Sequence, residues 1–122
     1  MKLTKLSSQA EVLAALNTIR VADEVKGRLL LKSQHVNLYI EGITAAAAIV
    51  LKQIALSEGA DVAIPMNVIE GYKGEVTVLL MANWREIERM LPRMREQPFK
   101  SLHRLADELE AHFPPTKWNG GR

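Results

Sequence analysis

The sequence predicts a single α/β domain in which helices pack on a small sheet. Stretches with the period-2 alternation of strands are interleaved with stretches whose apolar residues recur at helical spacing. The chain has 122 residues, which is near the size of one ordinary domain. Its 48% hydrophobic and 25% charged residues are typical of a globular protein. We therefore expect one domain over residues 1–113 and a flexible, proline- and glycine-rich tail over residues 114–122.

Three strands of a mixed sheet of three to five are well marked, at residues 35–42, 61–65 and 75–82. The first alternates apolar and polar side chains, with the period of a half-buried strand. The third is apolar on both faces, which favours a central strand covered on both sides. Weaker extended candidates lie at residues 1–6 and 28–32, with a turn between residues 23 and 27.

Three to four helices are expected to pack on this sheet. Ser8 and Glu11 form a capping box that predicts a helix over residues 9–20. Thr44 can cap a second helix over residues 45–58. That helix is apolar around nearly its whole circumference, so we expect it to lie sandwiched between other elements.

Two further helices follow the third strand. Asn83 with Glu86 opens the first of them, and Pro92 inside it should kink or split it. Ser101 is predicted to cap the last helix, over residues 101–113. The strand–helix–strand units give the chain its alternating character and are compatible with a ferredoxin-like split arrangement.

The composition argues against several classes of site. The chain has no cysteine, so disulfides, thiolate zinc sites and cysteine nucleophiles are excluded. The three histidines do not occur at metal-ligating spacing, and no nucleophile, base and oxyanion site assembles. No apolar run is long enough to span a membrane, and no signal peptide is apparent, so we expect a cytoplasmic protein without metal, cofactor or catalysis.

An arginine stripe is the most conspicuous charged feature. Arg85, Arg89 and Arg93 recur at helical spacing, which would place them on one face. One interpretation is a site for a pterin or another anionic metabolite, formed by Arg85, Arg89 and Asp61, and another is weak nucleic-acid binding through the stripe. The interpretation we favour is a solvated face neutralised by Glu86, Glu88 and Glu96. A net charge of +2 does not by itself indicate a nucleic-acid partner.

Two polar residues interrupt the apolar helix at 45–58. Lys52 and Gln53 need partners or an exposed seam, because unpaired polar groups are costly to bury. They are candidate contact residues. Gln97 and Phe99 flank Pro98 in an extended break between two helices, and this break is a second candidate contact element.

From Lys26 to about Leu109 the chain resembles the N-terminal extension of certain bacterial and archaeal dihydropteroate synthases. The resemblance rests on the helix 47–57 leading into 58–63, on the strand 78–81 with its following helix, and on Gln97-Pro98-Phe99 leading to Leu102. Ala60, Ala82 and Pro92 depart from the family pattern. The catalytic (β/α)₈ barrel, which needs about 200 residues or more, has no counterpart here.

The resemblance implies a role tied to folate or pterin metabolism. Our leading hypothesis is a non-catalytic accessory domain that binds a protein partner, either a dihydropteroate synthase core or a second copy of itself. The alternatives are a module that binds a pterin or another anionic metabolite, and a weak nucleic-acid binder.

Overall fold

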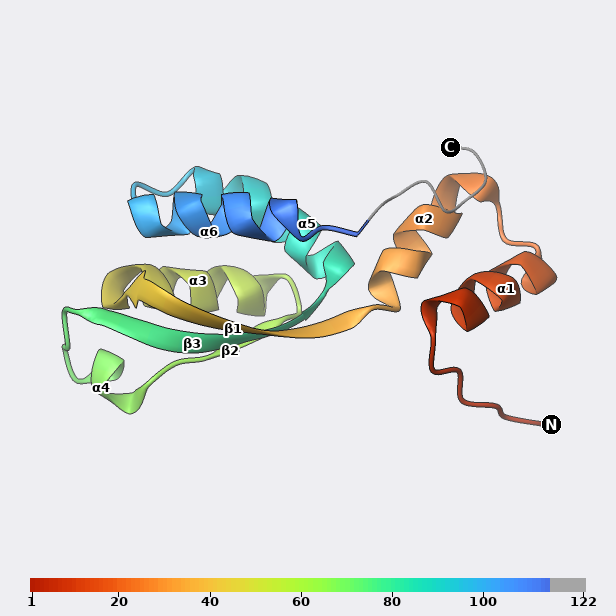
Figure 1. Ribbon diagram of the computed structural model, residues 1–122, viewed down its shortest axis with the longest axis horizontal. Coiled ribbons are helices and arrows are strands. Elements are labelled where there is room, and N and C mark those ends of the chain that lie inside the picture. The colour runs from red at the N-terminus through yellow and green to blue at the C-terminus, as the bar shows by residue number, and fades with distance from the viewer. Residues whose placement is uncertain (115–122) are drawn as a thin grey trace.

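The computed structural model describes residues 1–114, and within them six helices accompany a three-stranded sheet (Figure 1). The α/β class predicted from the sequence is confirmed. The predicted tail lies, from residue 115 on, outside the described residues. In chain order the elements are α1 (Gln9–Ile19), α2 (Asp23–Lys32), β1 (His35–Thr44), α3 (Ala45–Ser57), β2 (Asp61–Ala63), α4 (Met66–Ile69), β3 (Glu75–Asn83), α5 (Trp84–Arg95) and α6 (Lys100–Ala111).

The strands lie in the order β1–β3–β2, and both neighbouring pairs are antiparallel. The third strand is therefore central, as its apolar character predicted. Because β1 and β2 each run opposite to β3, they run parallel to each other and are joined by α3. The units β1–α3–β2–β3–α5 thus form a split β–α–β arrangement with β3 inserted between the two parallel strands.

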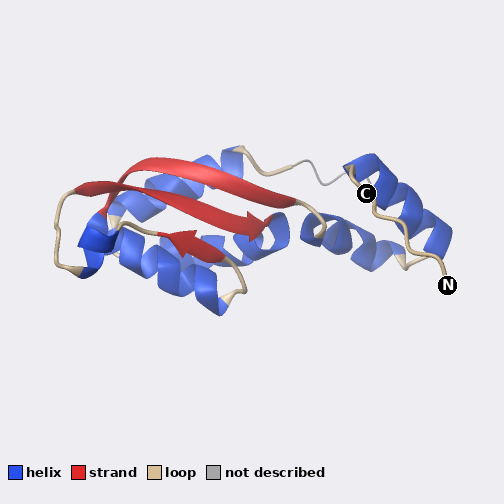
Figure 2. Ribbon diagram, turned by 90° about the horizontal axis from the view of Figure 1, so that it is seen from below, coloured by secondary structure: helices blue, strands red, loops and turns tan. Residues whose placement is uncertain are grey.

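Helices cover one face of this sheet and leave the other open (Figure 2). Val78, Leu80 and Ala82 of β3 point to the covered face and are buried beneath α3 and α5, while α6 packs against β1. Leu79 and Met81 point to the opposite face and remain partly exposed. The prediction of cover on both sides is therefore wrong for the described chain, because all three packed helices lie on one side.

Helix α3 has caps at both ends. The Thr44 side chain accepts a hydrogen bond from the Ala47 N–H, as predicted. Gly59 follows the helix with a φ of +91°, a conformation that favours glycine. A side chain at Gly59 would also bring its Cβ within 3.1 Å of the Glu86 carboxylate. The chain can therefore turn directly from α3 into β2 only because this residue is glycine.

The N-terminal segment differs from the prediction. Residues 23–32 form the helix α2, where the sequence indicated a turn followed by an extended segment. This helix buries the side chains of Leu30 and Leu31 in the protein interior. Their packing stabilises the helix by more than the low helix propensity of Gly27 destabilises it. Residues 1–6 form no strand, while α1 begins at Ser8 with the predicted capping box. Helices α1 and α2 lie beyond one end of the sheet (Figure 1).

Pro92 does not split helix α5, and the predicted cap of α6 is wrong. Helix α5 continues through the exposed Pro92, although the proline leaves the Glu88 carbonyl without its usual intrahelical partner. Phe99, and not Ser101, occupies the N-cap position of α6. Ser101 is buried in the first turn, and its hydroxyl lies 3.3 Å from the Thr44 hydroxyl.

Neighbouring leucines on β3 test the one-sided packing. Leu80→Ala should lower the free energy of unfolding by about 2–5 kcal/mol, because it opens a cavity in the covered core. Leu79→Ala, on the open face, should cost less than about 1 kcal/mol. Urea denaturation of both variants measures the difference. Equal costs would contradict an open face in the isolated chain.

Candidate interaction surfaces

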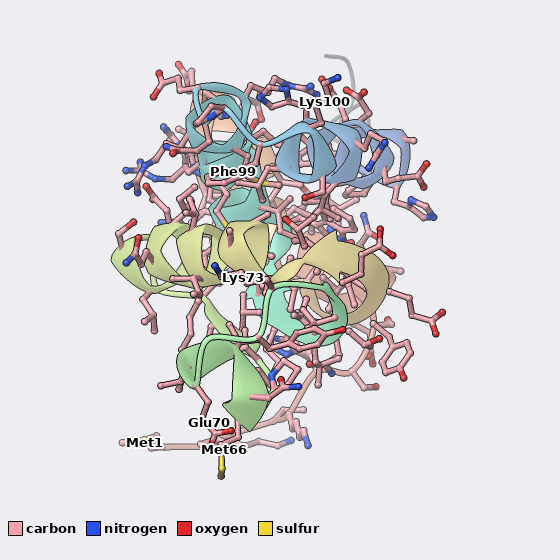
Figure 3. The ribbon with its side chains drawn as sticks, turned by 90° about the vertical axis from the view of Figure 1, so that its left-hand side faces the viewer. Met1, Met66, Glu70, Lys73, Phe99 and Lys100 are labelled. Carbon is pink, nitrogen blue, oxygen red and sulfur yellow. The ribbon has the colours of Figure 1, made fainter. Side chains whose placement is uncertain are left out.

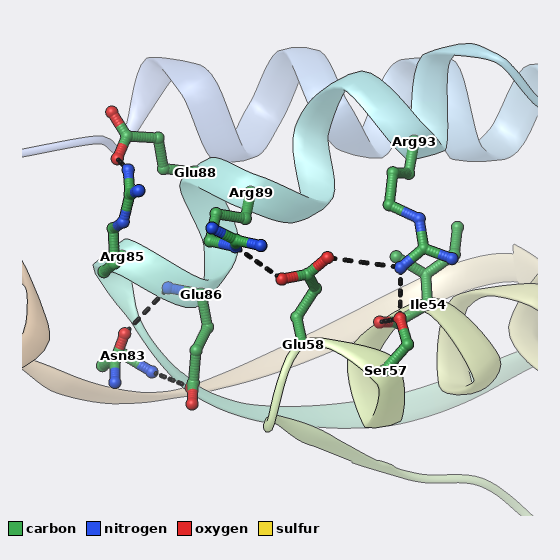
Figure 4. Close-up of polar contacts among 9 residues, drawn as sticks. All are labelled: Ile54, Ser57, Glu58, Asn83, Arg85, Glu86, Glu88, Arg89 and Arg93. Atoms are coloured by element: carbon green, nitrogen blue, oxygen red, sulfur yellow. Dashed lines mark hydrogen bonds and ion pairs between the residues drawn. The ribbon is translucent and has the colours of Figure 1, made fainter.

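A cluster of charges joins the end of α3 to α5 (Figure 4). The Arg89 Nε donates to Glu58 Oε1 at 2.7 Å, and the Arg93 guanidinium lies 3.3 Å from Glu58 Oε2 and also contacts the Ser57 hydroxyl. Glu58 caps the C-terminus of α3, where a negative charge faces the negative end of the helix dipole. The two arginines offset that repulsion. The hydrogen bond from Arg89 is the main reason that the pKa of Glu58 lies below its usual value.

The remaining arginines of α5 also contact carboxylates. Arg85 pairs with Glu88 at 2.6 Å, while Arg95 pairs with Asp107 and Glu110 of α6. The stripe is therefore neutralised, as the favoured interpretation had it, but largely by other residues than expected. Glu86 accepts from the Asn83 N–H in the capping box that starts α5 and pairs with no described arginine.

A cleft of about 800 Å³ separates α2 from the start of α5. Arg28 and Lys32 line it from α2, Arg85 and Arg89 line it from α5, and two carboxylates, Glu58 and Glu86, line it as well. Among residues 1–114, no carboxylate forms an ion pair with Arg28 or Lys32. The cleft therefore brings together two of the predicted site residues and adds two cations that sequence reasoning missed.

Lys52 and Asp61 meet at the outer edge of β2. The Lys52 ammonium donates to Asp61 Oδ1 at 2.9 Å and to the Val62 carbonyl at 2.8 Å. Asp61 Oδ1 also accepts from the Val62 N–H at 2.7 Å. The hydrogen bond from Lys52 is the main cause of the lowered pKa of Asp61. Asp61 is not part of the cleft that Arg85 and Arg89 line.

Gln53 lies on the exposed seam of α3. Its neighbours along the seam are apolar: Ile49 is 39% exposed and Leu56 is 53% exposed. The rest of the helix is buried between the sheet and α5, so the predicted sandwich with one open seam is confirmed. The structure thus separates the adjacent pair Lys52 and Gln53, which point to different surroundings.

Gln97 and Phe99 lie in the tight turn between α5 and α6, and Figure 3 labels Phe99 there. Phe99 is half-buried and packs against the core. The His103 Nε2 N–H donates to the Gln97 carbonyl, which fixes the turn. Neither residue lines the cleft between α2 and α5, and neither takes part in the Lys52–Asp61 contact at the β2 edge.

The open face of the sheet is the surface that sequence reasoning missed. Tyr39 of β1 stands opposite Leu79 on this face and is 72% exposed. Met81 lies one step along β3, opposite Asn37. Helix α4 also carries exposed apolar side chains: Met66, labelled in Figure 3, is 77% exposed, and Ile69 is 78% exposed. The apolar residues on both faces of β3 indicated this surface, but the prediction drawn from them was that helices of the same chain would cover both faces.

The described residues give no sign of two other kinds of site. No group of three histidine, aspartate or glutamate side chains within residues 1–114 could hold a metal ion. No helix in the same range is long and apolar enough to cross a bilayer.

Comparison with known proteins gives one relative. The chain is 34% identical over 80 residues to the bifunctional dihydropteroate synthase/dihydropteroate reductase of Helicobacter pylori. The similarity covers 66% of this chain and 21% of that enzyme, so the chain matches only about a fifth of its relative's length. No protein-family model matches the chain, and no solved structure does. The similarity links this chain to a region of a folate-pathway enzyme.

The ion pairs of Glu58 predict a specific loss of stability in acid. Because the pKa of Glu58 is lower in the folded state, its stabilising contribution is present above the ordinary value of 4.5 and is lost as the pH falls through the folded-state value. Glu58→Gln should therefore be destabilised at neutral pH and should lose less stability on acidification than the wild type.

Urea denaturation between about pH 7 and about pH 3 measures this difference. Glu70→Gln is the matched control, because Glu70 is exposed and forms no ion pair among the described residues. An unchanged pH dependence in Glu58→Gln would contradict a stabilising role for the Glu58 pairs.

Proposed function

We propose that this chain is a non-catalytic accessory domain that packs against a dihydropteroate synthase-type enzyme through the open face of its sheet. The observation that carries the proposal is the central strand. β3 bears apolar side chains on both faces, yet the described helices cover only one. Burying the second face against a protein partner would add hydrophobic stabilisation that water cannot provide.

The composition of the open face suits such a partner. Tyr39, Leu79 and Met81 lie together at its middle, with Asn37 and Thr77 around them. An aromatic and a methionine within a polar rim are typical of the centre of a protein–protein interface. The similarity to one region of a longer folate-pathway enzyme supports a partner of that class.

A charge placed on the open face should weaken docking. Met81→Lys should weaken binding to the dihydropteroate synthase of the same organism by about a hundredfold or more, since a charge buried without a partner costs roughly 3–5 kcal/mol. Isothermal titration calorimetry measures the binding. Circular dichroism checks that the variant is folded.

Gln53→Ala, on the α3 seam, is the matched control and should bind like the wild type. If Gln53→Ala loses binding while Met81→Lys keeps it, the synthase docks on α3 instead. If wild-type protein shows no binding at all, the proposed partner is wrong.

The cleft between α2 and α5 favours a second candidate function, the binding of a small anion, because four cationic side chains line it against two carboxylates. Arg28, Lys32 and Arg85 would supply the positive charge. Arg85 is paired with Glu88, whereas Arg28 and Lys32 form no ion pair within residues 1–114 that an anion would have to displace. Phosphate or carboxylate groups are natural ligands for such a set, because guanidinium groups bind them through two hydrogen bonds.

Thermal unfolding with inorganic pyrophosphate and with a pterin tests this candidate. A ligand at about a hundred times its dissociation constant should stabilise the protein by about 2.7 kcal/mol. Arg28→Gln should reduce the shift, whereas Arg104→Gln, outside the cleft, should not. No shift with either ligand would rule out an anion site of useful affinity.

A further inference from the structure

The outer edge of β1 is the longest exposed strand edge in the described chain. β1 has ten residues and pairs with β3 along one side. No strand within residues 1–114 pairs with its other side. In the split arrangement a further strand commonly follows the second helix, but here the chain continues into α6. Edges of this kind are templates for pairing with another chain.

The main-chain groups of alternate β1 residues point toward this edge. The Trp84 N–H donates to the Gln34 carbonyl at 3.2 Å, so these two residues face each other as a hydrogen-bonded pair. In an antiparallel ladder such pairs alternate with pairs that direct their groups outward. His35, Asn37 and Tyr39 are therefore residues whose N–H and C=O groups face the open edge.

The opposite edge of the sheet, at β2, is closed by side chains. Val62 is the middle residue of this short strand, and its carbonyl and N–H are bound by Lys52 and Asp61 respectively. The strand itself has only three residues. A lysine and a short strand are common ways to protect an edge from pairing. Between His35 and Thr44, β1 has no lysine or proline, and its single bulge lies near one end, between Glu41 and Ile43.

A groove runs beside the β1 edge. It has a volume of about 340 Å³ and separates β1 from α6. Leu38 and Ile40 line it from the strand, and Leu105 and Leu109 line it from the helix. An added strand would therefore gain apolar contacts on the helix side as well as main-chain hydrogen bonds at the edge.

We propose that this edge pairs with β1 of a second copy of the chain, antiparallel and about a two-fold axis at Tyr39. This pairing would join the two sheets into one of six strands. It would place Leu38 beside Ile40 of the partner subunit on the helix side, and Asn37 beside Glu41 of the partner subunit on the open face. Two-fold pairing requires a surface that is complementary to itself.

The sequence around Tyr39 meets that requirement. The residues directly before and after Tyr39, Leu38 and Ile40, are both apolar. The residues two positions away, Asn37 and Glu41, can both form hydrogen bonds. The two Tyr39 rings would form a cross-strand aromatic pair, an arrangement that stabilises antiparallel sheets. Glu41 and Glu108 line this groove, and Arg104 lines the adjoining pocket together with the same two carboxylates, so charges of both signs flank the edge. About six main-chain hydrogen bonds would form between the outward-facing residues.

Sedimentation equilibrium of the full chain over a range of concentrations tests the proposal. The wild type should be a dimer in reversible equilibrium with monomer. Asn37→Pro removes an outward N–H without touching the ladder to β3, and Tyr39→Lys sets two like charges opposite each other. Each change should raise the dissociation constant of the dimer about tenfold or more.

Two controls make the result specific. Asn37→Ala keeps the main-chain N–H and should remain dimeric. Met81→Lys lies on the open face away from the edge and should also remain dimeric, which separates this proposal from docking on the synthase. The proposal is overturned if the wild type stays monomeric at the highest soluble concentration. It is equally overturned if both edge variants, shown by circular dichroism to be folded, dimerise as tightly as the wild type.

Discussion

Helix α3 imposes the constraint on which the rest of the structure depends. It is apolar around nearly its whole circumference and therefore needs cover on two sides. The sheet supplies one cover and α5 supplies most of the other, so that α3 contacts every later element and β1. Alanines at positions 45, 47, 48 and 55 are buried, which allows the neighbouring backbones to approach closely. Placing the available helices around α3 leaves none for the far face of the sheet.

The packing of the helices around α3 explains why the two edges and the two faces of the sheet differ. Lys52 can reach the β2 edge because α3 lies directly beside β2, and it occupies the Val62 carbonyl there. The β1 edge lies beside α6, whose Leu105, Glu108, Leu109 and the following His112 line the groove, and within the described residues no α6 side chain hydrogen-bonds to a β1 main-chain group. Side chains therefore hydrogen-bond to the main chain at the β2 edge, whereas within the described residues the β1 edge is unpaired and one face of the sheet is uncovered.

Much of the fold, but little of the site, could be predicted from the sequence. The strands, α3 and two capping boxes follow from local patterns, because caps and periodicity act within a few residues. α2 was missed because Gly27 and its charged neighbours resemble a turn, although Asp23 at its start and Lys32 at its end match the helix dipole. The contacts of Glu58 with Arg89 and Arg93 join residues more than thirty positions apart. No local pattern specifies which helices become neighbours.

The open face and the β1 edge would reinforce each other. A two-fold axis perpendicular to the sheet leaves both open faces on the same side of a continuous six-stranded sheet, with the two Tyr39 rings at its centre. Each dimer would then present two copies of the docking surface in a fixed geometry. A partner that is itself two-fold symmetric could engage both at once, and the second contact would form at the high effective concentration set by the first. A modest affinity of each face could thus give stable attachment in the proposed accessory role, although each open face offers few apolar side chains.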